Sequence, residues 1–181
     1  PAKTNSDTRM VMMLSKSQYM RGLQCVKSLW LYRRRKDLIP ETSTDNQMIF
    51  DQAREIGLLA RKRFPGGVEI DEDFRHGREA IQRTRNEIEN GARVLYEAAA
   101  LFNNVLIRAD ILKLAADGAW DLIEVKSSSE VKDEYLNDVA IQTYVLNGAG
   151  FRIRRSMLLH VNKKFVRHGD IDLREFFTLV D

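Results

Sequence analysis

Residues 105–126, VLIRADILKLAADGAWDLIEVK, contain two apolar stretches separated by the turn signal Asp117-Gly118. Asp-Gly tolerates the positive φ angles of tight hairpin turns, so we expect two antiparallel strands here. Side chains alternate between the two faces of a strand, which puts Glu124 and Lys126 on one face. Pairing through the turn brings Asp110 opposite Glu124, give or take one residue. The segment therefore predicts two carboxylates and an amine at one point of a sheet.

This grouping has the chemistry of a divalent-metal site beside a phosphodiester. Asp110 and Glu124 supply carboxylate oxygens and Val125 a carbonyl oxygen, ligands that suit Mg²⁺ or Mn²⁺ and suit Zn²⁺ poorly. A metal held there activates water, while Lys126 orients that water or stabilises charge on the phosphate. Glu-x-Lys is also frequent on solvated strands, but the apolar neighbours favour a half-buried strand pair, where charges need partners. The hairpin thus predicts a metal-dependent nuclease.

The helix expected after the hairpin extends this pattern, because it carries Gln142 and Tyr144. With the three hairpin side chains, these residues resemble the PD-(D/E)XK nuclease superfamily, and the likeness is strongest to its RecB-like branch, which includes the CRISPR-associated exonucleases. The resemblance touches most of residues 14–165, with Gln-x-Tyr in place of the longer Gln-x-x-x-Tyr spacing. It implies a restriction-endonuclease-like core and exonuclease action on DNA ends or single strands. It also implies that Gln142 positions the lysine or the substrate and that Tyr144 supports the site or the scissile phosphate.

Two departures from that family affect the ligands and cofactors. RecB-like members often carry a metal-binding His on an early helix after a Gly, but no His lies near Gly57. Glu55 on that helix, or Glu97 on the first main strand, is the candidate for the missing ligand. The iron–sulfur members use four cysteines, whereas Cys25 is the only cysteine here, so this chain alone cannot hold such a cluster. Mg²⁺ or Mn²⁺ is therefore the expected cofactor.

The periodicity along the chain predicts an α/β fold, a single domain with a central mixed β-sheet flanked by helices. We expect helices over residues 15–36, 46–64, 77–90, 131–146 and 173–179, and strands over residues 68–70, 93–99, 105–112, 120–126 and 154–162. In the first helix, Leu23, Val26 and Trp30 form the expected buried stripe, and Cys25 is expected to be buried. Trp30 and Trp120 are assigned to the core rather than to base stacking.

Composition limits the class of protein. The chain has 181 residues, 44% hydrophobic and 30% charged, which is ordinary for one globular domain. No apolar run reaches the length of a membrane span, and a single cysteine fits a reducing, cytoplasmic compartment. We expect residues 1–13 to form a disordered tail and residues 14–181 the nuclease-like domain. Because it ends on the apolar stretch 176–179, we expect a missing C-terminal part or a protein partner.

Clustered basic residues point to DNA as a partner. The net charge is only +3, but arginines and lysines gather at residues 33–36, 61–63, 152–155 and 163–167. Such groups bind phosphate backbones without regard to sequence, although cations at helix C-termini also complement the helix dipole without any partner. Two alternatives remain open. One is a DNA-binding module whose cleavage is lost or needs a partner, and the other is an RNA-processing nuclease.

Overall fold

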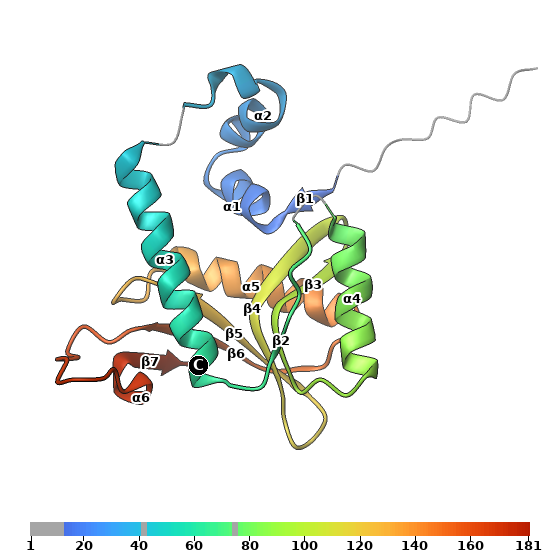
Figure 1. Ribbon diagram of the computed structural model, residues 1–181. Coiled ribbons are helices and arrows are strands. Elements are labelled where there is room, and N and C mark those ends of the chain that lie inside the picture. Colours follow the sequence, from blue (N-terminus) through green and yellow to red (C-terminus); the bar gives the residue numbers. More distant parts are fainter. Residues whose placement is uncertain (1–12, 41–42, 74–75) are drawn as a thin grey trace, which may run out of the picture.

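A mixed β-sheet runs through the part of the chain that the computed structural model describes, which is residues 13–40, 43–73 and 76–181 (Figure 1). Its strands are β1 (Leu14–Ser15), β2 (Val68–Glu69), β3 (Val94–Phe102), β4 (Val105–Leu114), β5 (Trp120–Lys126), β6 (Ile153–Val161) and β7 (Phe177–Val180). Neighbouring strands follow the order β2-β3-β4-β5-β6-β7, and β1 pairs with β4 off this path. The mixed sheet confirms the expected α/β class. The tail expected over residues 1–13 lies outside the described residues, apart from Met13.

The predicted hairpin forms the centre of this sheet. Strands β4 and β5 are antiparallel, and Ile111 lies opposite Ile123. One further step in the same register puts Asp110 across from Glu124, as the turn chemistry predicts. Gly118 has a φ of 75°, in the left-handed region that glycine adopts without a steric cost, which explains why Asp-Gly closes this turn.

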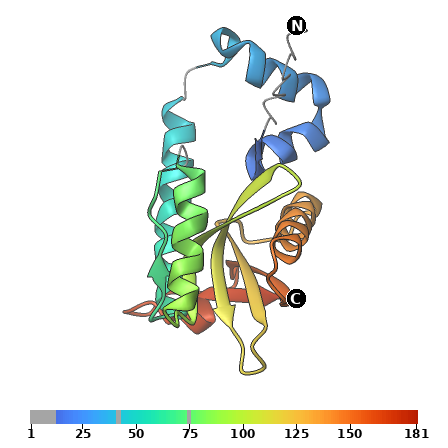
Figure 2. The same cartoon turned by 90° about the vertical axis from the view of Figure 1, so that its right-hand side faces the viewer.

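Helices cover the sheet on both sides. In the described residues, the helices are α1 (Lys16–Gln24), α2 (Val26–Arg34), the short 3₁₀ helix η1 (Lys36–Leu38), α3 (Thr44–Arg63), α4 (Gly77–Glu89), α5 (Asp133–Gly148) and α6 (Leu173–Phe176), and the sheet is covered mainly by α3, α4 and α5. Figure 2 shows α5 on one side of the central strands and α3 on the other. Strands β5 and β6 are parallel, so their connection crosses over the sheet, and α5 is that crossover.

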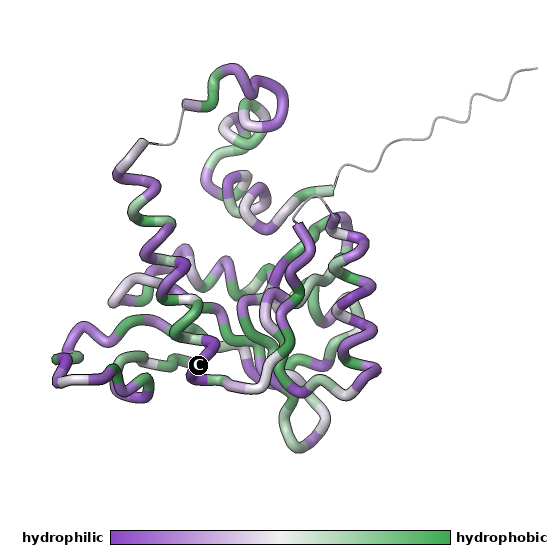
Figure 3. The backbone as a smooth tube through the Cα atoms, in the orientation of Figure 1, coloured by the Kyte–Doolittle hydropathy of each residue, from purple (hydrophilic) through white to green (hydrophobic). Residues whose placement is uncertain are grey.

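Two groups of buried side chains hold these layers together. The larger group joins the sheet to α4 and α5 and includes Leu95, Ile107 and Val145. The smaller group joins the sheet to α3, through Ile56 against Ile123 and its neighbours. Figure 3 shows the apolar stretches following the central strands, which is where both groups meet. The central strands are therefore rigidly held, and polar side chains on them have fixed positions.

The single N-terminal helix expected over residues 15–36 is wrong. Cys25 is extended (φ −164°, ψ 113°) and separates α1 from α2. Trp30 is 57% exposed, and Leu23, Val26 and Cys25 are exposed as well, so the expected buried stripe does not form. The reason is position, because α2 lies beyond the end of the sheet (Figures 1 and 2), while α1 packs against the core through Tyr19 and Met20 and leaves Leu23 outside.

The helix expected over residues 173–179 is also wrong, because α6 has only four residues and the chain then continues as β7. Thr178 pairs with His160 of β6, and Phe177 is buried. Trp120, by contrast, is buried, which confirms its assignment to the core. Among the described residues, no helix combines the length and apolar character needed to cross a membrane.

Gly148, at the end of α5, provides a test of this packing. A Cβ built on Gly148 would lie 2.2 Å from a ring carbon of Phe102 on β3. We expect Gly148→Ala to lower the free energy of unfolding by about 2 kcal/mol, since the ring must move within a packed layer. Gly57→Ala, in the middle of α3 with no atom within 4 Å of its Cβ, is the matched control. Urea denaturation that finds both variants equally stable would contradict this packing.

Candidate active site

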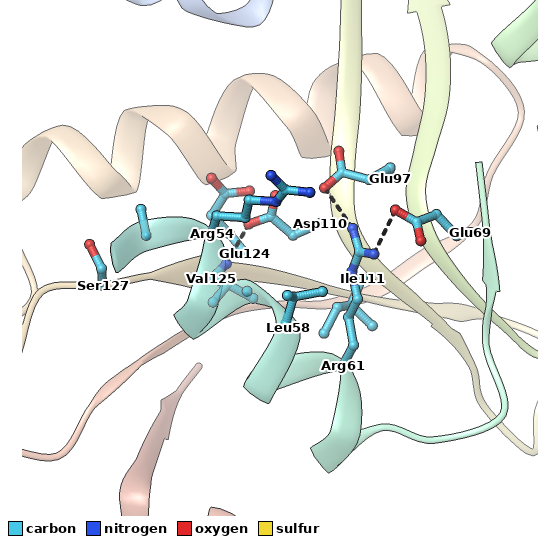
Figure 4. Close-up of a pocket in the computed structure, with 12 residues that line it drawn as sticks. Arg54, Leu58, Arg61, Glu69, Glu97, Asp110, Ile111, Glu124, Val125 and Ser127 are labelled. Carbon is cyan, nitrogen blue, oxygen red and sulfur yellow. Dashed lines mark hydrogen bonds and ion pairs between the residues drawn. The ribbon is translucent and has the colours of Figure 1, made fainter. Parts of the chain in front are cut away.

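Asp110 and Glu124 meet where the regular pairing of β4 and β5 stops. The last paired residues are Ile111 and Ile123, and beyond them the Asp110 carboxylate accepts a hydrogen bond from the Val125 N–H at 2.7 Å. Asp110, Glu124 and Val125 line one pocket of about 410 Å³ beside α3 (Figure 4). The N–H and C=O of a strand residue point to the same neighbouring strand, so the Val125 carbonyl lies on the Asp110 side. Three hard oxygen donors therefore face one space.

Glu97 belongs to the same pocket, whereas Glu55 does not. The β3–β4 register on either side places Glu97 across from Asp110, and Glu97 has a φ of 57°, which interrupts the ladder there. The Glu97 carboxylate accepts a hydrogen bond from Arg61 at 3.3 Å, and Arg61 also pairs with Glu69 at 2.6 Å (Figure 4). Glu55 is exposed on α3 and does not line the pocket.

Glu124 is the residue on which the other side chains converge. It is 2% exposed, so its charge needs partners inside the protein. Its carboxylate accepts hydrogen bonds from Lys126 Nζ at 2.8 Å and from Gln142 Nε2 at 2.7 Å. Lys16 Nζ, at the start of α1, lies 3.0 and 3.2 Å from the two carboxylate oxygens. The predicted trio of Glu124, Lys126 and Gln142 is thus brought together, with Lys16 added.

Asp138 completes this network and, like Lys16, was given no role from the sequence. One oxygen of its carboxylate pairs with Lys126. The other oxygen lies 3.3 Å from Lys16 Nζ and accepts a hydrogen bond from Gln142 Nε2 at 3.3 Å. The spacing of four residues between Asp138 and Gln142 places them on one helix face. This spacing is the feature of the sequence from which Asp138 could have been identified as a site residue. Nothing in the sequence links Lys16 to Glu124, because 108 positions separate them.

The two lysines open toward a second pocket, on the other side of Glu124. This space of about 370 Å³ lies between α1 and α5. Its charged lining residues are the three cations Lys16, Arg21 and Lys126 and the two acids Glu134 and Asp138, so positive charge is in excess. Lys126 Nζ also lies 5.1 Å from the centre of the Tyr135 ring. The site therefore has a carboxylate side facing α3 and a cationic side facing α1.

Tyr144 is not brought to this site. It lies two residues after Gln142, which turns it about 200° around the helix. Its ring is 49% exposed and packs edge-on against Phe102, and its hydroxyl accepts a hydrogen bond from the Asn103 side chain at 2.6 Å. The position of Tyr144 therefore gives no support to the role that the resemblance implies for it.

The charges at the centre are set by burial and by the lysines. Burial, and then the negative charge of Glu124, raise the pKa of Asp110 to about 8. Burial would also raise the pKa of Glu124, but Lys16 and Lys126 outweigh it and hold that pKa at about 2. The same carboxylates raise the pKa of both lysines above the ordinary value, against the effect of burial. Glu124 is therefore held in its charged form between two ammonium groups, whereas burial and the charge of Glu124 disfavour a second negative charge on Asp110.

Most of the predicted basic clusters are paired within the protein. Arg63 donates to carbonyl oxygens of α6 and β7, and Arg154 pairs with Asp121 at 2.7 Å. Lys163 pairs with Glu130. Arg54 is different, because it lines the carboxylate pocket, is exposed and has no partner in the described part of the chain. Arg54 is thus a free cation beside the carboxylates.

The donor set fits a hard divalent ion held by few protein ligands. In the described ranges, no three Asp, Glu, His or Cys side chains are grouped closely enough to hold a metal by themselves. Mg²⁺ is usually bound by one or two carboxylates, with water and substrate phosphate completing its shell. Asp110, Glu124 and the Val125 carbonyl match that pattern, while Glu97 is engaged by Arg61. No family model matches this sequence, and no curated protein matches it.

Proposed function

We propose that this chain is a metal-dependent nuclease that hydrolyses phosphodiester bonds in DNA with Mg²⁺ or Mn²⁺, on a restriction-endonuclease-like core of the PD-(D/E)XK type. One observation carries the proposal. Asp110 and Glu124 line one pocket at the end of a strand pairing, and Lys126 and Gln142 are both bonded to Glu124. A strand pair that needed only stability would gain little from four polar side chains at one point. The exposed thiol of Cys25 agrees with a reducing, cytoplasmic location.

Each side chain has a distinct role in this proposal. Asp110, Glu124 and the Val125 carbonyl would hold the ion, which supplies Lewis-acid polarisation of the phosphate and a more acidic water. Gln142 fixes the Glu124 carboxylate by its 2.7 Å hydrogen bond. Lys126 compensates the carboxylate charge and stabilises negative charge on the phosphate. Arg54, free at the pocket, is suited to bind a phosphate oxygen of the substrate.

A second function is favoured by one feature, the saturation of Glu124. Both of its oxygens already accept hydrogen bonds from Lys16, Lys126 and Gln142. A carboxylate so fully engaged suits a DNA-binding module with a nuclease-like fold, in which cleavage is lost or needs a protein partner. Mn²⁺ titration distinguishes the two functions, since a working site binds the ion through Asp110 and Glu124. An RNA-processing nuclease keeps the same site and differs in substrate preference.

The test is cleavage of end-labelled single-stranded and duplex DNA, and of RNA, with Mn²⁺, Mg²⁺ or EDTA. We expect metal-dependent products, and their length ladder reports the polarity. In Lys126→Met the rate is expected to fall about 100-fold, because one preorganised cation is lost. Lys113→Met is the matched control, since Lys113 is exposed on the same hairpin and lies over the Phe64 ring. Binding of DNA and Mn²⁺ without any cleavage would overturn the catalytic proposal.

A further inference from the structure

The N-terminal arm, residues 14–40, differs from the rest of the chain in charge and in exposure. It contains seven basic side chains and one acidic side chain, a net charge of +6. The whole chain has a net charge of only +3, so the other residues are net negative by 3. The arm also exposes large apolar side chains, Val26 at 76% and Trp30 at 57%. This combination marks an interaction surface for an anionic partner with apolar or aromatic faces.

Trp30 is placed on α2 between two free cations. Lys27 precedes it by three residues and Arg34 follows it by four, and these spacings put all three on one helix face. All three side chains are exposed. Neither Lys27 nor Arg34 has a hydrogen-bond or ion-pair partner among the residues that the structure describes. An indole flanked by two free positive charges is the arrangement that holds a base and its neighbouring phosphates.

The other cations of the arm already bind groups within the protein, unlike Lys27 and Arg34. Arg21 donates to Ser28 and lies 4.6 Å from the centre of the Tyr32 ring. Arg33 donates to the Met13 carbonyl and to Gln18, Arg35 pairs with Asp37, and Lys16 binds Glu124. Among the residues that the structure describes, Lys27, Arg34 and Lys36 have no partner, so these three cations of the arm are the ones available to an external anion.

We propose that the N-terminal arm binds a single-stranded nucleic acid, with a base stacked on Trp30 and phosphates held by Lys27 and Arg34. The inference rests on the proposed nuclease function and names the element that delivers its substrate. A single strand is required because the bases of a duplex are already stacked on one another and offer no face to an indole. Helix α1 begins at Lys16, which contacts Glu124, and Arg21 of α1 lines the cationic pocket and packs on Tyr32 of α2. Contacts between α2 and α1, and between α1 and Glu124, thus connect the arm to the candidate active site.

A protein occupant is the competing explanation, since Met48, Ile49 and Phe50 on α3 are exposed as well. A second copy docked arm to arm would oppose two surfaces of charge +6, which disfavours that pairing. The exposed apolar side chains Val26 and Trp30 alone would suit a protein partner. A protein partner does not explain why the indole has one cation on each side, Lys27 and Arg34, for which the described residues supply no partner. The charge therefore favours a polyanion.

The experiment measures binding of an oligothymidylate of about 12 nucleotides, a length within ordinary single-strand sites. EDTA is present so that no cleavage occurs. The chain has two tryptophans, so in a Trp120→Phe background Trp30 is the only indole, and its emission reports stacking directly. We expect saturable quenching of Trp30. In the anisotropy of an end-labelled oligothymidylate, which needs no indole in the protein, we expect affinity to fall about tenfold in Trp30→Ala and little in Trp30→Phe. Val26→Ala is the matched control, because Val26 lies one turn earlier on the same face, is exposed and has no ring.

Salt dependence tests the cations separately. The slope of log affinity against log salt concentration is expected to shrink by about 0.7 for each of Lys27→Gln and Arg34→Gln. Arg35→Gln, which removes a cation already paired with Asp37, is expected to change the slope less. A duplex should compete poorly with the oligothymidylate. Binding of an oligouridylate of equal length shows whether the arm has the higher affinity for DNA or for RNA.

Three results would overturn the proposal. The first is that the oligothymidylate does not quench Trp30 emission. The second is that Val26→Ala and Trp30→Ala lose equal affinity, as expected for a protein-docking surface. The third is that Trp30 emission changes with protein concentration alone, as expected when a second copy binds. The nuclease proposal is judged separately. An oligonucleotide bound through Trp30 but not cut when Mn²⁺ is added leaves the arm proposal standing and removes the nuclease. If the oligonucleotide is cut but its binding does not depend on Trp30, the nuclease proposal stands and the arm proposal is overturned.

Discussion

A Glu124→Gln variant is expected to cleave DNA about a thousandfold more slowly than the wild type in Mn²⁺. The amide keeps the shape of the side chain but removes the charge that the cation would meet. Glu124 is also the carboxylate on which Lys16, Lys126 and Gln142 converge, so the substitution removes the central charge of the site. Asp110→Asn should have a similar effect, because Asp110 supplies the second carboxylate of the same pocket. Both substitutions act on charge at one point of a rigid sheet.

Single-turnover cleavage and calorimetric titration of Mn²⁺ measure this prediction together, with circular dichroism to confirm the fold. Asp121→Asn is the matched control. Asp121 is a buried acid on the same strand β5, but it pairs with Arg154 and does not line the pocket. Wild-type rates in Glu124→Gln, or an equal loss in Asp121→Asn, would show that the carboxylate pocket is not where cleavage occurs.

A Lys16→Met variant should bind Mn²⁺ about tenfold more tightly than the wild type, which is a gain of about 1.4 kcal/mol. The Lys16 ammonium lies 3.0 Å from one Glu124 oxygen and 3.2 Å from the other, so it competes with a metal ion for the same carboxylate. Charges this close in a partly buried site interact by several kcal/mol. Removing the lysine removes the competitor.

The same variant should be less stable without metal. In EDTA, Lys16→Met is expected to lose about 2 kcal/mol of unfolding free energy, since Glu124 and Asp138 keep only Lys126 as a counter-charge. Mn²⁺ should restore most of the loss. Urea denaturation with and without Mn²⁺ measures both effects. Lys36→Met is the control, because Lys36 is exposed and has no partner within residues 13–40, 43–73 and 76–181. A variant that loses stability equally in Mn²⁺ and in EDTA would contradict competition for the carboxylates.

Local signals account for what the sequence predicted well. Asp117-Gly118 sets the turn, the turn sets the register, and the register places Asp110 across from Glu124. Alternation along β5 and helical spacing along α5 then bring Lys126 and Gln142 to the same point. Each of these steps depends on residues close together in the chain, where backbone geometry alone decides the outcome.

Long-range packing accounts for what the sequence could not predict. Lys16 reaches Glu124 only because β1 pairs with β4 and holds the start of α1 against the site. Trp30 has the spacing of a buried stripe, but burial requires a second layer, and α2 has none above it. Tyr144 resembles a site residue in sequence, yet its helix turns it away from Gln142. Periodicity indicates which residues share a face and leaves open what the face contacts.

The distances in sequence between Lys16, Asp110, Glu124 and Gln142 have a consequence for how the chain matures. Lys16 and Asp138 are 122 positions apart, yet they pair with each other beside one buried carboxylate, Glu124, with which Lys16 also pairs. During synthesis the hairpin is made before α5, so Glu124 has neither Asp138 nor Gln142 beside it until that helix has emerged. The charge-balanced centre can therefore form only after all residues from Lys16 to Gln142 have been synthesised. Under the proposed nuclease function, the hairpin alone would be inactive, and the site would become competent only after α5 has packed against it.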